Sequence, residues 1–296
     1  MIFINESSKS SSVILLKNFH ANEDSMIIKR RLTLAIFPVC MTFLSVPLSV
    51  HAAADGETSV SLGAEYSTGD YGTLSKTTIW YFPATLKYEA DVNMISLTVP
   101  YVSVEGQGDV VPTAGGDMGM GRGASPISRS STRTSTRTDS GFGDVVLTGS
   151  HAIVSTVSAR IDLTGKIKFG TADEKDNLGT GENDYAVQLD LENHLNSNSI
   201  FGSAGYKILG DPPGTDFRNV FYGSIGFSHR LDAVRTAGLA YDAQQTTLSG
   251  ASGQSELTLF LSNKLDKKTK LTGYVLKGLA DGSPDWGLGI ALKLAQ

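Results

Sequence analysis

This sequence is poor in cysteine. Its 296 residues contain a single cysteine, Cys40, so no intramolecular disulfide can form. Cys40 also lies before residue 53, where we expect the mature chain to begin, which leaves the mature protein without a thiol. This pattern is typical of an exported protein that is stabilised by something other than disulfides.

Charge and long apolar runs are scarce as well. Asp, Glu, Lys and Arg make up 19% of the residues and the net charge is −5, which argues against a general nucleic-acid-binding protein. After residue 50, no segment supplies the roughly 20 unbroken apolar residues that a membrane helix needs. If the mature protein spans a membrane, it must therefore do so with β-strands.

The N-terminus carries a targeting signal. A basic run at residues 29–31 precedes an apolar stretch at 32–50, and small residues follow it. These three parts define a secretory signal peptide, and we expect cleavage after Ala52. The predicted organisation is a signal peptide over 1–52 and one domain over 53–296.

Two alternatives concern this N-terminal region. The residues before Met26 are polar and unlike the start of a signal peptide, so Met26 is a candidate natural start. A permanent membrane anchor is the other reading of the apolar stretch. Pro38, Pro47 and the alanine-rich end argue against it.

Residues 160–195 are the most informative stretch of the mature chain. Apolar side chains at Ile161, Leu163, Ile167 and Phe169 alternate with charged or polar ones, and the same alternation returns after a Gly-bearing connection. Successive strand residues point to opposite faces, so this stretch predicts an antiparallel hairpin with one apolar and one charged face. Either a membrane barrel or a soluble sandwich could use such a pair.

The alternation of short and long connections favours the barrel. Connections after even-numbered strands are short, whereas all but the last of those after odd-numbered strands are longer, as in bacterial outer-membrane barrels. We therefore predict an all-β, antiparallel transmembrane β-barrel of about 12 strands in the bacterial outer membrane. The twelve strands are expected at residues 58–68, 76–88, 92–104, 141–153, 158–169, 184–195, 199–209, 218–231, 235–244, 256–265, 269–278 and 285–294.

The polar faces of these strands predict the lining of the lumen. The principal lining residues are expected to be Arg160, Asp162, Lys166, Lys168, Asp184, Gln188, Asp190 and Glu192. Arg218 and Lys277 are assigned to the same surface, while Phe201 is assigned to an aromatic girdle at the inner end of the lipid-facing side. The paired charges could form a selectivity element or a ladder of ion pairs that fills a narrow lumen.

A loop at residues 105–140 is too long for an ordinary connection. It carries Arg122, Arg129, Arg133 and Arg137 among Ser, Thr and Gly residues. A loop of this kind could fold into the pore as a lid or constriction, or present a basic patch to lipopolysaccharide phosphates. The alternative is a solvated surface loop.

Four segments carry a family resemblance: TTIWYFPATLKYE at 77–89, LTVPY at 97–101, SGFGDVVL at 140–147 and GTGENDY at 179–185. Together they resemble the outer-membrane transporter-like family named for the MetA pathway of phenol degradation. The resemblance implies an outer-membrane barrel that takes up aromatic or other small hydrophobic compounds. It brings no catalytic residues to this chain.

A metal site and an enzyme active site find little support in the residues of this chain. The acidic loop at 173–177 lacks the ligand order of a calcium-binding loop, and Ser150 and Ser228 precede His151 and His229 on opposite strand faces. We expect no enzyme activity, metal or cofactor. The predicted function is a monomeric, passive channel for small solutes, aromatic or hydrophobic ones included, with outer-membrane lipid, lipopolysaccharide and the barrel assembly machinery as partners. The alternative is a structural or surface-interaction barrel whose lumen is plugged.

Overall fold

The computed structural model describes residues 56–108, 110–112, 126–128 and 135–296. The predicted signal peptide, its cleavage point and the alternative start at Met26 lie outside these residues, as do Arg122, Arg129 and Arg133. No helix long and apolar enough to cross a membrane occurs among the residues described.

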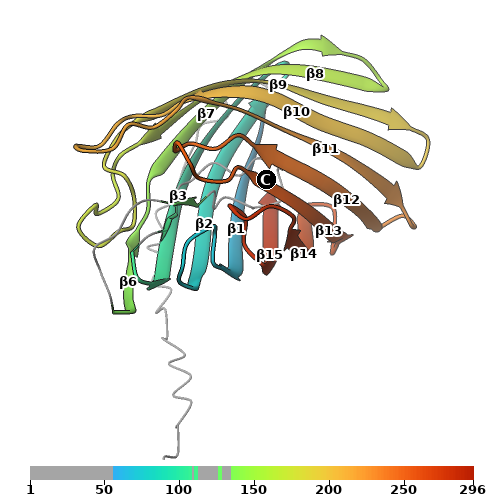
Figure 1. Ribbon diagram of the computed structural model, residues 1–296. Coiled ribbons are helices and arrows are strands. Elements are labelled where there is room, and N and C mark those ends of the chain that lie inside the picture. The colour runs from blue at the N-terminus through green and yellow to red at the C-terminus, as the bar shows by residue number, and fades with distance from the viewer. Residues whose placement is uncertain (1–55, 109, 113–125, 129–134) are drawn as a thin grey trace, which may run out of the picture. The chain divides into compact units, whose positions relative to one another are not determined.

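The described chain is an antiparallel β-barrel (Figure 1). Consecutive strands pair along the sequence, and β1 pairs with β15 through contacts such as Tyr66 opposite Leu288, which closes the ring. The wall strands are β1 (Gly56–Gly69), β2 (Thr77–Ala90), β3 (Asn93–Gly106), β6 (Arg137–Phe142), β7 (Val145–Ser155), β8 (Ala159–Phe169), β9 (Asp184–Leu195), β10 (Asn198–Ile208), β11 (Val220–Arg230), β12 (Arg235–Gln244), β13 (Gln254–Lys264), β14 (Thr269–Gly278) and β15 (Trp286–Ala295).

β6 and β7 are two halves of one interrupted strand. Both pair with β3, and between them the main-chain N–H of Gly143 donates to the carbonyl of Pro100 at 2.9 Å. Counted in this way the barrel has twelve strands, which confirms the predicted fold class.

The fourth strand begins earlier than its sequence suggests. We expected it at residue 141, but β6 starts at Arg137, so the connection from β3 covers only residues 107–136. The polar stretch at 137–140 has no apolar alternation to mark it as a strand. Beyond the membrane, however, strand pairing needs no lipid-facing apolar face.

Side chains alternate across the wall as predicted. On β9, Val187, Leu189 and Leu191 are 47–53% exposed on the outer face, whereas Gln188 between them is 3% exposed. The outer face is a belt of apolar side chains, which suits contact with lipid, and buried charged side chains such as Glu65, Lys168 and Asp184 lie on the inner face.

Aromatic side chains gather on the outer face near the long connections. The ring of Tyr66 lies 5.0 Å from that of Trp80 and 5.3 Å from that of Trp286, and Tyr206 lies 4.8 Å from Phe221. This cluster corresponds to one interfacial girdle. The assignment of Phe201 to the other girdle was wrong, because Phe201 shares the inward parity of Ser203 and Lys207 on β10.

Candidate functional site

The inner face of β8 and β9 holds the eight residues expected to line the lumen. The strands pair so that Arg160 faces Glu192, Asp162 faces Asp190, and Lys168 faces Asp184. Lys166 and Gln188 occupy inward positions between these pairs. All eight thus share one surface, and their role in solute passage remains a prediction.

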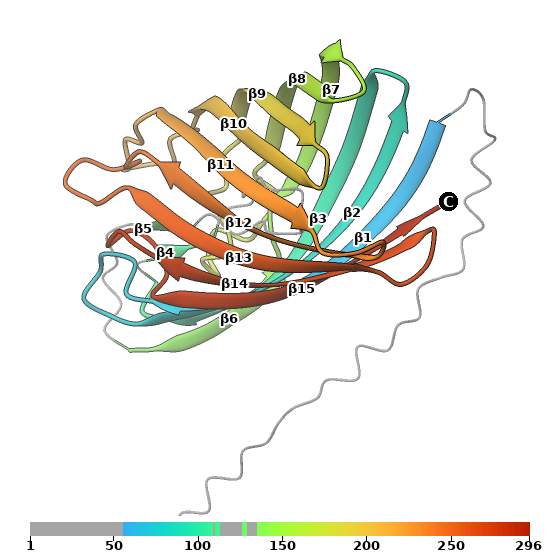
Figure 2. The ribbon, with the colours of Figure 1, turned by 90° about the vertical axis from the view of Figure 1, so that its right-hand side faces the viewer.

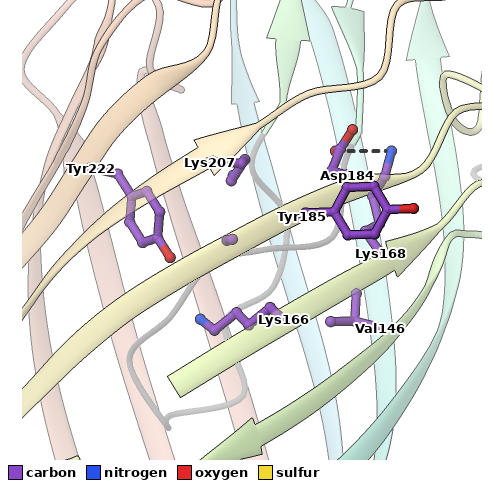
Figure 3. A pocket seen from close by; sticks show the side chains of 8 residues that line it. Val146, Lys166, Lys168, Asp184, Tyr185, Lys207 and Tyr222 are labelled. Carbon is purple, nitrogen blue, oxygen red and sulfur yellow. Dashed lines mark ion pairs between the residues drawn. The ribbon is translucent and has the colours of Figure 1, made fainter. Parts of the chain in front are cut away.

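Lys168 is the centre of a buried ion cluster, and Figure 3 shows its pair with Asp184. The ammonium of Lys168 is 3.0 Å from a carboxylate oxygen of Asp144 and 3.1 Å from one of Asp184, and it donates to Thr180 at 3.1 Å. Lys168 and Asp144 are both almost fully buried. Buried charges persist when they are paired and hydrogen-bonded, so this cluster is structural in character.

The same carboxylates hold two connections in place. Asp144 accepts a hydrogen bond from the main-chain N–H of Ala172 at 3.0 Å, and Asp184 accepts one from that of Gly210 at 3.1 Å. Sequence reasoning missed Asp144. Its only signal was the Gly-Phe-Gly-Asp turn that interrupts the strand.

Gln188 is the centre of a second polar network. Its side-chain oxygen accepts hydrogen bonds from Tyr222 at 2.7 Å and from Lys166 at 3.3 Å, and its amide donates to Asp190. The Thr164 hydroxyl donates to the other oxygen of Asp190 at 2.6 Å. The predicted charges of β8 and β9 are therefore bonded to one another and to neighbouring strands.

This network continues around the wall. The ammonium of Lys207 lies 5.4 Å from the centre of the Tyr222 ring and donates to Gln244 at 3.1 Å. Gln244 donates in turn to Gln254 on β13 at 3.4 Å. Gln188 was expected at the lumen, but Gln244, Gln254 and Tyr222 were not, because uncharged polar residues carry no distinctive pattern.

The lumen between these groups contains a cavity of about 270 Å³. Arg160 is bonded to the lining residue Asp162, with its Nε donating to both carboxylate oxygens at 3.0 and 2.8 Å. The lining includes Asp162, Asp190 and Glu192 on β8 and β9, and Phe201, Ser203 and Ser224 on the neighbouring strands β10 and β11. Carboxylates therefore line the cavity along β8 and β9, and Met94, Leu191 and Phe201 add apolar surface.

Two sequence assignments to the lumen were wrong. Lys277 shares the outward parity of Val275 and is exposed, while Arg218 lies in the connection before β11. The inward positions of β14 are instead Lys270, Thr272, Tyr274 and Leu276. Lys270 was missed because the apolar residues Leu271, Val275 and Leu276 do not keep a single parity.

A short ribbon lies at the end of the barrel where the long connections gather (Figure 2). It consists of β4 (Val110–Val111) and β5 (Ile127–Ser128), which pair antiparallel. Val110 packs with the inward residues Ile79, Val102 and Val104 of β2 and β3. Ile127 packs with Leu209, Phe217 and Val220 beside β10 and β11, so the ribbon contacts two parts of the wall.

Hydrogen bonds attach the ribbon at both sides. The side-chain amide of Asn177 donates to the carbonyl of Val110 at 2.9 Å, and that of Gln254 donates to the carbonyl of Pro126 at 2.5 Å. Tyr71, from the β1–β2 connection, packs in the same cluster as Val110. Burial raises the pKa of the Tyr71 hydroxyl well above its usual range, so it remains a neutral donor to Ser67.

The predicted constriction loop is only partly described. Arg137 belongs to β6, where its guanidinium lies 2.5 Å from Asp139 and 3.0 Å from Asp176. It therefore links the barrel rim to the 170–183 connection. No cluster of three or more side chains suited to a metal ion occurs in the described ranges, including the acidic loop at 173–177.

A solved outer-membrane channel has a similar fold. The COG4313 outer membrane channel from Pseudomonas putida F1 is similar over 83% of this chain and 97% of its own, with a TM-score of 0.62 and 14% identity. The KdgM porin matches over 79% of this chain and 98% of its own, with a TM-score of 0.49 and 10% identity. The chain has the fold of an outer-membrane β-barrel. No family model matches it, and no curated protein does, so the resemblance to the MetA-pathway family remains a prediction.

Proposed function

We propose that the protein is a monomeric outer-membrane channel through which small solutes pass without an energy source. The observation that carries this proposal is the contrast between the two faces of the wall. The outer face is an apolar belt, whereas the inner face places charged side chains, among them Asp162, Asp190 and Glu192, around a cavity of about 270 Å³. Charged side chains are costly in hydrocarbon, but a water-filled lumen tolerates them.

The ribbon of β4 and β5 is the constriction in this proposal. Val110 and Val111 are at most 1% exposed, and the ribbon is hydrogen-bonded to residues of two different parts of the barrel. In this position the ribbon narrows the path through the lumen at the end of the barrel where the long connections lie. Lipopolysaccharide and the barrel assembly machinery are the partners that an outer-membrane location implies.

The same ribbon favours a second candidate function. A barrel whose lumen is closed by a buried ribbon could serve as a structural or surface-interaction protein without transport. The two candidates differ in one measurable property, which is the flux of ions and solutes through the intact chain.

Single-channel conductance of the full-length, refolded protein in planar bilayers tests the proposal. The matched variant replaces residues 107–136, between β3 and β6, with a short Gly-Ser linker. We expect small openings from the wild type and conductance several times larger from the variant. Conductance from the variant alone would support the plugged barrel, and no conductance from either protein would overturn the channel.

Cell fractionation tests the location. We expect the protein in the outer-membrane fraction, with gel mobility that changes on heating, as folded barrels show. Recovery in the soluble fraction would contradict the proposed location. Liposome swelling with sugars, alcohols and aromatic acids then ranks the solutes that pass.

A further inference from the structure

Three lysines lie side by side on the inner face of the last three strands. Lys264 on β13 is paired directly with Lys270 on β14, and Lys270 is paired directly with Lys293 on β15. All three belong to the inward parity of their strands. We call Lys264, Lys270 and Lys293 the lysine row.

The row has too few anionic partners to balance its charge. Lys293 lies 3.7 Å from Glu57, but neither Lys264 nor Lys270 makes an ion pair with any residue that the structure describes. The nearby Glu89 is paired with Lys87 at 2.5 Å. Like charges directly opposite each other on adjacent strands are destabilising, so this arrangement favours binding of an anion.

Charges on the facing strands do not remove this excess. Glu192 is the carboxylate on the opposite wall that interacts with Lys270. It also faces Arg160, which is its cross-strand neighbour. At this end of the lumen the inner faces of β13–β15 carry the lysine row, whereas those of β8 and β9 carry Asp162, Asp190 and Glu192 beside Arg160. An anion is therefore drawn to the lysine side.

An aromatic pair connects this wall with β10, whose Phe201 is the cross-strand partner of Glu192. Phe260 is inward on β13, four residues from Lys264, and its ring centre is 6.3 Å from that of Phe201 on β10. Both rings lie over glycines, since a Cβ added at Gly238 or Gly226 would come within 2.3 Å of them. The two rings thus lie over the backbone of β11 and β12, where glycine leaves room for them.

The spacing between the two features fits a small amphipathic molecule. Four strand residues span about 13 Å, and an extended lysine side chain covers about half of that distance. The remaining gap is about the size of one substituted ring. The hydroxyls of Ser262 and Thr272, 2.8 Å apart, occupy the wall between them.

We propose that this wall binds aromatic monocarboxylates during their passage. The carboxylate is held by Lys264 and Lys270 through charge-assisted hydrogen bonds, and the ring packs on Phe260 and Phe201. This inference rests on the proposed channel function and names the solute class that the channel favours.

Binding of benzoate to the detergent-refolded, full-length protein tests the site independently of conduction. The variant K264Q/K270Q removes both charges and keeps an unbranched, polar side chain at each position. The matched control K267Q removes a lysine from the exposed β13–β14 turn at the same end of the barrel. We expect benzoate to bind the double variant about tenfold more weakly than the wild type or K267Q.

Two further measurements separate the parts of the proposal. Acetate should bind more weakly than benzoate, and F260A should reduce this preference without abolishing carboxylate binding. Equal benzoate affinity in wild type and K264Q/K270Q would overturn the site, as would equal affinity for acetate and benzoate. Benzoate binding without conductance would support the binding site but overturn the channel function. Gel mobility before and after heating verifies that each variant folds.

Discussion

Asn177 donates a hydrogen bond from its side-chain amide to the main-chain carbonyl of Val110, at 2.9 Å. The two residues are 67 positions apart, and both are almost fully buried. Asn177 also has a positive φ of 60°, a conformation that Asn and Gly adopt more readily than other residues. One side chain therefore fixes the 170–183 connection against the ribbon that narrows the proposed path.

Replacing Asn177 with glycine should loosen the ribbon. Glycine accepts the positive φ, so the main loss is the hydrogen bond, and an unsatisfied carbonyl costs about 1–3 kcal/mol. We expect larger and more frequent openings in single-channel recordings. N196G is the control, because Asn196 has φ 59° in a tight turn away from the ribbon. Identical recordings from wild type and N177G would contradict a constricting role for the ribbon.

Lys168 should contribute more to stability than the neighbouring Lys166. K168M leaves Asp144 and Asp184 buried beside each other without a cation, and breaking such a buried pair costs about 3–5 kcal/mol. K166M removes a 3.3 Å hydrogen bond to Gln188 in a more open part of the lumen, so a smaller loss is expected. Urea unfolding followed by heat-dependent gel mobility gives both values. Equal losses would show that the buried cluster is not a stability determinant.

The sequence was sufficient for the architecture because the membrane imposes a strict pattern. Alternation on strands such as β9 and the contrast between short and long connections gave the strand number and the faces. The pattern weakens where the membrane ends or where polar and apolar residues mix. Hence the polar start of β6 was missed, and Lys277 was assigned to the face on which Lys270 lies.

Less of the candidate site than of the fold could be predicted from the sequence. Its charged residues on β8 and β9 were found, since a charge on one strand face is conspicuous. The partners that complete each network come from distant strands, as Asp144 does for Lys168 and Tyr222 does for Gln188. Such partnerships depend on register and barrel closure, which no local pattern encodes. The position of the ribbon likewise depends on contacts between segments that are far apart in the chain.

Asp266 in the β13–β14 turn should make stability depend on pH. The main-chain N–H of Lys268 donates to its carboxylate, as does that of Thr269, and these bonds lower the pKa of Asp266 below its ordinary value. A lowered folded-state pKa stabilises the protein above the unfolded value, near pH 4, and the effect is lost as pH falls through the folded value.

Thermal unfolding of wild type and D266A should therefore converge in acid. Above about pH 5 the wild type is expected to unfold at the higher temperature, and the difference should shrink as the pH falls below about 4. D232A is a parallel case, because N–H groups of Val234 and Arg235 lower the pKa of Asp232 in the same way. A constant difference between wild type and D266A across this range would show that the carboxylate charge is irrelevant to the turn.

A side chain at Gly289 should destabilise the protein, whereas one at Gly273 on the adjacent strand should not. A Cβ at Gly289 would lie 2.3 Å from the Tyr274 ring, whose hydroxyl donates to Glu65 at 2.5 Å, whereas the nearest atom to a Cβ at Gly273 is 4.0 Å away. G289A must displace the ring and disturb that buried hydrogen bond, so we expect a loss of about 1–3 kcal/mol. G273A extends into open space on the lipid side and should leave stability nearly unchanged. Urea midpoints measured on the two variants provide the comparison. Equal midpoints would show that Tyr274 can move away from the wall at little cost, and that Glu65 does not hold it there.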